Sequence, residues 1–105
     1  VLGAVQVGML RALTDAGIRP DLVLGTSVGA LNGAVLAAVE PAEAADRLDA
    51  LWSSPDARAL FAAGTFGRLR ELARSGVAAH SASPLRRAVT EVLGERRIED
   101  LTVRF

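Results

Sequence analysis

One serine in this sequence stands in a spacing that is typical of a catalytic nucleophile. Ser27 lies between Gly25 and Gly29 in the pattern G-x-S-x-G. An apolar run at 21–24 precedes the pattern, and a stretch of small and apolar residues at 28–39 follows it. A strand, a tight turn and a helix in this order expose a serine hydroxyl at the turn. The spacing therefore predicts a serine that attacks a carbonyl carbon, in hydrolysis or in acyl transfer.

The two glycines have a steric role in this interpretation. The turn is so tight that the serine backbone is strained, and we expect a side chain at Gly25 or Gly29 to collide with neighbouring backbone. The hydroxyl of Ser27 then lies at a helix N-terminus, where free N–H groups and the helix dipole favour developing negative charge. The alternative is a glycine-rich turn in which Ser27 only caps the helix.

The elements around the turn follow from hydrophobic spacing and from glycine and proline. Residues 1–13 are expected to form a helix entered through Gly3, and Gly17 is expected to end it. The side chains that share one face of this helix are Val5, Met9, Ala12 and Leu13. Residues 22–24 and 102–105 are expected to be strands, and the rest of the chain is expected to be helical apart from turns.

The opening helix, followed by G-T-S-V-G-A-L-N-G, resembles the start of patatin-like phospholipases. In that family a glycine-rich loop, G-G-G-x-x-G, opens a helix of the type G-A-x-Q-x-G-x-L-x-A-L, and Gly3 matches the last glycine of the loop. The resemblance implies an α/β fold, a three-layer Rossmann-like arrangement with a mostly parallel central sheet. We expect residues 1–105 to be the N-terminal part of a single domain of this kind, incomplete at both ends.

The resemblance also implies an activity. It is serine-dependent hydrolysis of lipid esters, of the phospholipase or lysophospholipase type, through an acyl-enzyme on Ser27. The base is an aspartate in a Ser-Asp dyad, in a D-G-G or D-G-A motif, and no aspartate of this chain is followed by glycine. Gly3 is then a remnant of the loop that holds the oxyanion. The expected partners are a lipid substrate and, transiently, a membrane surface, with no metal or organic cofactor.

Two alternatives remain beside hydrolysis. In a transacylase of the same fold, an alcohol acceptor replaces water. In a truncated relic, the chain is a binding module without catalysis.

The composition excludes some classes of partner and of metal site. The formal net charge is zero, which gives no case for a nucleic-acid partner. Cysteine is absent, which excludes a disulfide framework and thiolate metal sites. Arginine without lysine, together with abundant alanine, points to a GC-rich bacterial genome. The most apolar run, residues 28–39, is too short to span a bilayer. A cytoplasmic or peripheral membrane location is expected.

Two weaker candidates lie between residues 60 and 83. His80 is the only histidine, and a Ser-His-Asp hydrolase would need one. Its polar surroundings favour a solvated loop histidine instead. Arg68, Arg70 and Arg74 could place a basic helix on an anionic membrane, although an ordinary exposed face is the preferred interpretation.

Overall fold

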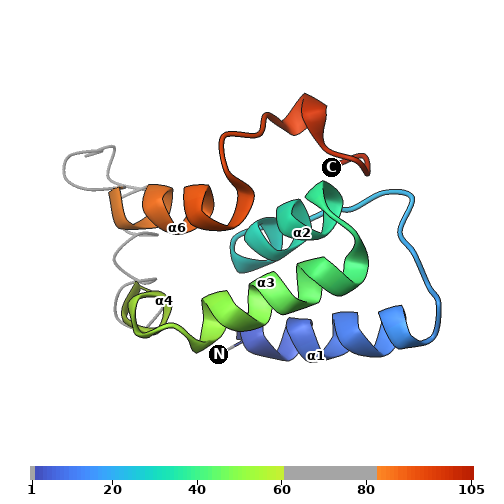
Figure 1. The fold of residues 1–105 in the computed structure, drawn as a ribbon, viewed down its shortest axis with the longest axis horizontal. Helices are drawn as coiled ribbons and strands as arrows, with labels where there is room; N and C mark the ends of the chain where they lie inside the picture. Colours follow the sequence, from blue (N-terminus) through green and yellow to red (C-terminus); the bar gives the residue numbers. More distant parts are fainter. Residues whose placement is uncertain (1, 61–82) are drawn as a thin grey trace.

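The computed structural model describes residues 2–60 and 83–105, and their elements are helical (Figure 1). His80 and the three arginines Arg68, Arg70 and Arg74 lie outside the described residues. The elements are α1 (Leu2–Asp15), α2 (Val28–Ala38), α3 (Pro41–Ser53), α4 (Pro55–Leu60), α6 (Ser83–Leu93) and the 3-10 helix η1 (Ile98–Asp100).

The end of α1 follows from its glycine. Gly17 has φ 73°, a left-handed conformation that glycine adopts without steric cost. The Gly17 N–H donates to the Thr14 carbonyl at 2.9 Å, and the Ile18 N–H donates to the Leu13 carbonyl at 3.0 Å. This pair of bonds is a Schellman motif, which satisfies carbonyls left open at a helix end. The expected opening helix and its stop at Gly17 are therefore confirmed.

The junction between α3 and α4 is built by a serine and a proline. The Ser54 hydroxyl donates to the Leu51 carbonyl at 2.8 Å and accepts from the Ala57 N–H at 3.1 Å. It thus bonds the end of one helix and the start of the next. Pro55 begins α4, where a missing N–H costs no helical hydrogen bond.

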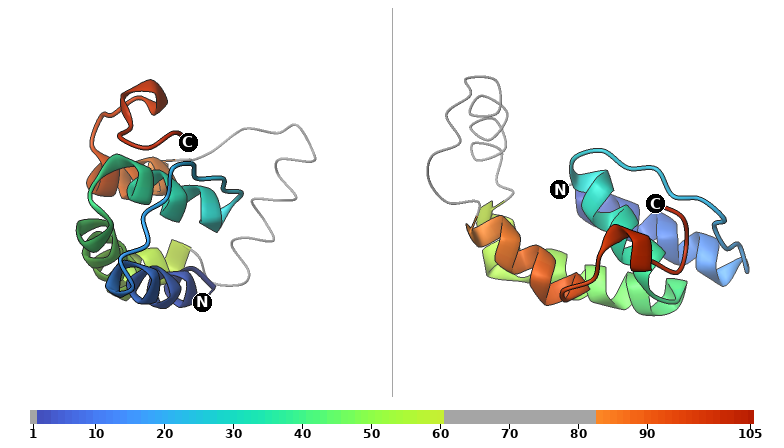
Figure 2. Two further views of the ribbon diagram at one scale, coloured as in Figure 1. Left: turned by 90° about the vertical axis from the view of Figure 1, so that its right-hand side faces the viewer. Right: turned by 90° about the horizontal axis from the view of Figure 1, so that it is seen from above.

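Helix α3 lies at the centre of the described structure. It contacts α1, α2, α4 and α6, and α1 and α2 also contact each other (Figures 1 and 2). The two largest fully buried side chains, Leu48 of α3 and Val35 of α2, lie in this core. Together with them the core contains Val7, Leu31, Ala44, Leu51, Trp52, Ala57 and Val92.

The expected three-layer α/β fold with a mostly parallel sheet is wrong for the described residues, which contain helices and no sheet. The two expected strands meet only in one parallel bridge, between Leu22 and Arg104. The Val23 N–H donates to the Arg104 carbonyl at 2.9 Å. Before Arg104 the chain bonds to α2 instead: the Val103 N–H donates to the Ala37 carbonyl at 2.9 Å. A ladder needs repeated bonds between two extended segments, and here the residue before Arg104 bonds to α2 rather than to the first segment.

The apolar face of α1 that sequence spacing identifies is exposed. Val5 is 60%, Met9 62% and Leu13 46% exposed, whereas Gly3 and Val7 are buried. Helix α1 faces α2 and α3 with the side that carries Gly3 and Val7, and Gly3 leaves room there for the Trp52 ring. Hydrophobic spacing therefore located the helix but not the side on which the described residues pack.

Among the described residues, no helix is both long enough and apolar enough to cross a bilayer.

Candidate functional site

Ser27 has a strained backbone at the point where the extended segment turns into α2. Its φ is 56° and its ψ is −126°, and it is the one non-glycine residue with positive φ in the described part of the chain. Residues other than glycine rarely adopt this combination of φ and ψ, because their Cβ crowds the neighbouring backbone. The strain costs about 1–3 kcal/mol. The residue is nevertheless exposed. Strain of this kind is retained at functional sites when the surrounding structure enforces it.

Gly25 is confined by the first turn of α2. A Cβ added to Gly25 would overlap the Gly29 carbonyl oxygen and lie 2.7 Å from the Ala30 Cα, both of them backbone atoms. Backbone in a helix cannot move aside as a side chain can. The steric expectation is therefore confirmed at Gly25, and the tight turn depends on the absence of a side chain there.

Gly29 differs from Gly25. A Cβ at Gly29 would meet only the Gln6 Nε2, at 3.8 Å, which is an ordinary contact. The expectation of a backbone collision at this position is wrong for a single added methyl group. The physical reason is that Gly29 lies inside α2, where Cβ points away from the helix backbone.

The alternative of a capping serine is not what the structure contains. Ser27 precedes α2, but its side chain makes no capping hydrogen bond. The contribution of Ser27 to the helix start comes from its carbonyl, which accepts from the Ala30 N–H at 3.0 Å and the Leu31 N–H at 3.3 Å. The hydroxyl is thus not used by the helix.

A buried amide lies one turn beyond the elbow. Asn32 is 7% exposed, and its Nδ2 donates to the Gly3 carbonyl at 3.2 Å and to the Gln6 Oε1 at 2.7 Å. Its Oδ1 accepts from the Trp52 Nε1 at 3.0 Å. One side chain therefore links α1, α2 and α3. Sequence reasoning assigned no role to Asn32, although an amide inside the apolar stretch 28–39 was a usable signal.

Gly3 packs directly against an aromatic ring. A Cβ at Gly3 would overlap the Trp52 Cζ2 and lie 2.6 Å from its Cε2. The glycine that sequence analysis assigned to an oxyanion loop thus lies buried in the first turn of α1. Its carbonyl bonds to Asn32, so Gly3 and the elbow helix share one hydrogen-bonded cluster.

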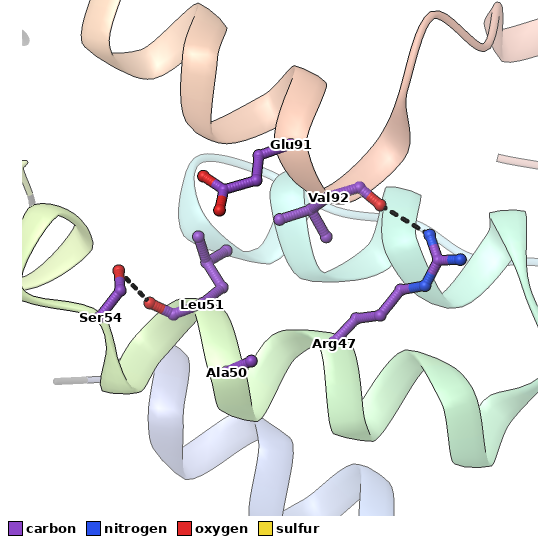
Figure 3. Close-up of a pocket in the computed structure, with 6 residues that line it drawn as sticks. All are labelled: Arg47, Ala50, Leu51, Ser54, Glu91 and Val92. Atoms are coloured by element: carbon purple, nitrogen blue, oxygen red, sulfur yellow. Dashed lines mark hydrogen bonds between the residues drawn. The ribbon is translucent and has the colours of Figure 1, made fainter.

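Two of the hollows near these helices lie beside the elbow and between α3 and α6. One, of about 250 Å³, lies beside the elbow between α1, residues 23–24 and α2, and Gly29 and Asn32 are in its lining. The other, of about 230 Å³, lies between α3 and α6 (Figure 3). There the Arg47 guanidinium donates to the Val92 carbonyl at 2.9 Å, which joins α3 to the end of α6. Ser27 is in the lining of neither hollow, and we assign the hollow between α3 and α6 no part in the chemistry.

Two acidic side chains of α3 pair with an arginine of α1. Arg11 pairs with Asp46 at 3.1 Å and with Asp49 at 3.3 Å, both on α3 and both exposed. These pairs join α1 to α3 on the surface.

Among the described residues there is no cluster of three or more His, Asp or Glu that could hold a metal ion.

Comparison with known proteins gives one family. The model of the family described as patatin-like phospholipase matches residues 1–105, the whole chain. No solved structure gives a significant match.

Three curated relatives illustrate the range of similarity. Lysophospholipase nte1 of Aspergillus terreus is 54% identical over 35 residues, which are 33% of this chain and 2% of that protein. Neuropathy target esterase sws of Drosophila persimilis is 29% identical over 103 residues, 98% of this chain and 7% of its own length. The patatin-like phospholipase domain-containing protein ZK370.4 of Caenorhabditis elegans has the same identity and coverage, 29% over 98% of this chain and 7% of its own length. The chain thus spans only a small part of these relatives.

Proposed function

Because this chain belongs to the patatin-like phospholipase family, we propose that it contains the nucleophile of a serine lipid acyl hydrolase. The family supports the class, hydrolysis of lipid esters. The observation that favours Ser27 as the nucleophile is its strained and exposed position before α2, with a hydroxyl that does not cap the helix. Residues 1–105 are, in this proposal, the N-terminal part of one catalytic domain.

The proposed reaction has two steps. The Ser27 Oγ bonds to the ester carbonyl carbon while its proton passes to the base, and the alcohol then leaves with that proton as the C–O bond breaks. Water next attacks the acyl-enzyme, giving its proton to the same base, and the fatty acid departs as Ser27 recovers its hydrogen. The proposed base is an aspartate outside residues 1–105.

The turn at Ser27 supports the first step for a physical reason. An Oγ that becomes bonded to carbon leaves a negative oxygen on the substrate. The start of α2 offers backbone N–H groups and the positive end of a helix dipole near that charge. The substrate class we propose is a glycerophospholipid or a lysophospholipid, and one similar protein is named a lysophospholipase.

The test uses the full-length protein that contains this chain. Ser27→Ala is compared with Ser53→Ala, which removes an exposed hydroxyl at the end of α3. We expect Ser27→Ala to lose fatty-acid release from lysophosphatidylcholine and phosphatidylcholine vesicles, and Ser53→Ala to keep it. Loss of a triad or dyad nucleophile typically removes several orders of magnitude in kcat, roughly 10⁶-fold in one protease. Full turnover by Ser27→Ala would show that the assignment is wrong.

Hydrolysis and transacylation are distinguished in the same assay. Both begin with an acyl-enzyme on Ser27, and they differ in the acceptor that resolves it. With a monoacylglycerol added to the vesicles, a hydrolase still releases mainly free fatty acid. A product in which the acyl group has moved to the added alcohol would favour the transacylase. A full-length protein that neither hydrolyses nor transfers would be the non-catalytic relic.

A further inference from the structure

Asn32 joins α2, the helix that follows the turn at Ser27, to α1 and α3. It lies in α2, five residues after Ser27, and is buried between the first turn of α1 and the last turn of α3. Both of its Nδ2 bonds go to α1, to the Gly3 carbonyl and to the Gln6 side chain, and its Oδ1 accepts from Trp52 at the end of α3. A buried amide with these partners fixes direction as well as distance, because each bond has a preferred angle.

The Gln6 side chain extends this connection to the turn itself. Its Oε1 accepts from Asn32 at 2.7 Å. Its Nε2 lies 3.8 Å from the place where a Cβ on Gly29 would stand, two residues after Ser27. Gln6 thus lies against the first turn of α2 while Asn32 holds its other amide atom. The elbow therefore rests against α1 through a pair of amides rather than through apolar contact alone.

We infer that Asn32 is a positioning residue, which sets the place of Ser27 by holding the start of α2 against α1 and α3. The inference rests on the proposed function of Ser27. Asn32 does not touch the reacting atoms, and it acts through the helix that Ser27 begins. Strain at Ser27 has to be maintained by its surroundings, and the only buried polar side chain in the described core is part of those surroundings.

The most selective variant is Asn32→Asp in the full-length protein. The Gln6 amide can rotate and donate Nε2–H to one carboxylate oxygen, and Trp52 can still donate to the other. Only the Gly3 carbonyl then loses its bond from residue 32 and faces negative charge. A displacement of about 1 Å at a reacting group can cost roughly 10²-fold in rate. We expect kcat for p-nitrophenyl butyrate to fall by about 10- to 100-fold on this ground, while KM stays within about twofold.

Turnover per reactive serine separates positioning from folding. Reactive sites are counted with a fluorophosphonate probe, and kcat is expressed per labelled serine. Loss of stability alone lowers the number of sites and leaves turnover per site unchanged. Val92→Ala, a buried change in α6 outside the amide cluster, is the matched control and should behave in that way. Asn32→Asp should instead lower turnover per site.

A second variant keeps the test decisive if Asn32→Asp does not fold. Gln6 is exposed, so Gln6→Leu should fold, and it removes the acceptor of the shortest Asn32 bond. It should lower turnover per site by a smaller factor than Asn32→Asp. Wild-type turnover per site in Asn32→Asp would overturn the inference, as would wild-type turnover per site in Gln6→Leu if the first variant is not obtained. Either result, with Ser27→Ala inactive, leaves the proposed nucleophile standing. Activity in Ser27→Ala would instead reject the nucleophile.

Discussion

The Gly29 carbonyl oxygen occupies the space that a side chain at Gly25 would need. The two glycines of G-x-S-x-G therefore have different roles in one turn. Gly25 must lack a side chain for α2 to begin where it does, and Gly29 contributes the backbone that excludes that side chain.

The first prediction compares alanine at the two positions. Gly25→Ala should lower the free energy of unfolding by about 1–3 kcal/mol, the usual cost of forcing an atom into a packed site. It should also lower esterase activity, since relief of the clash moves Ser27. Gly29→Ala should be as stable as wild type or slightly more stable, because alanine is favoured over glycine in a helix by up to about 1 kcal/mol. Urea unfolding of the full-length variants measures both. Equal losses at the two positions would contradict the geometry of the turn.

The sequence predicted the turn because its cause is local. G-x-S-x-G between an apolar run and a small-residue stretch depends on contacts within five residues of Ser27, and the φ of Ser27 and the confinement of Gly25 agree with it. The role of Gly29 was mistaken because the direction of its Cβ depends on where α2 starts. A motif does not specify that boundary to one residue.

Contacts between residues far apart in the sequence could not be predicted from a local motif. Whether residues 22–24 pair with residues 102–105 depends on how the chain between them packs. The C-terminal segment makes one bridge, at Arg104, and bonds to Ala37 through the preceding residue, Val103. The packed side of α1 was missed for a related reason. The Trp52 ring packs against α1 at Gly3, where there is no room for a side chain. Hydrophobic spacing identifies large apolar side chains and so does not indicate this contact.

The second prediction tests the contact between Gly3 and Trp52. Gly3→Ala places a methyl group against the rigid indole ring and should destabilise by about 1–3 kcal/mol. Trp52→Phe removes the part of the ring that Gly3 faces, at a cost of its own. The double variant should therefore be less destabilised than the sum of the single variants, with a coupling of about 0.5–3 kcal/mol. Strict additivity in a urea double-mutant cycle would show that the two residues do not touch.

The third prediction concerns the junction of α3 and α4. Ser54→Ala removes a hydroxyl that bonds both Leu51 and Ala57, and should cost about 0.5–2 kcal/mol, as for other helix caps. The neighbouring Ser53→Ala removes an exposed hydroxyl and should stay within about 0.5 kcal/mol of wild type. Thermal unfolding of the two variants gives the comparison. If both lost the same stability, the cap would have no special role.

The identity of the residue that forms the covalent adduct tests most directly whether Ser27 is the nucleophile. The full-length protein is treated with a fluorophosphonate, digested, and analysed by mass spectrometry. We expect one modified peptide, with the phosphonyl group on Ser27, and no such adduct in Ser27→Ala. An adduct on another residue, or unchanged labelling of Ser27→Ala, would show that the strained serine before α2 is not the nucleophile.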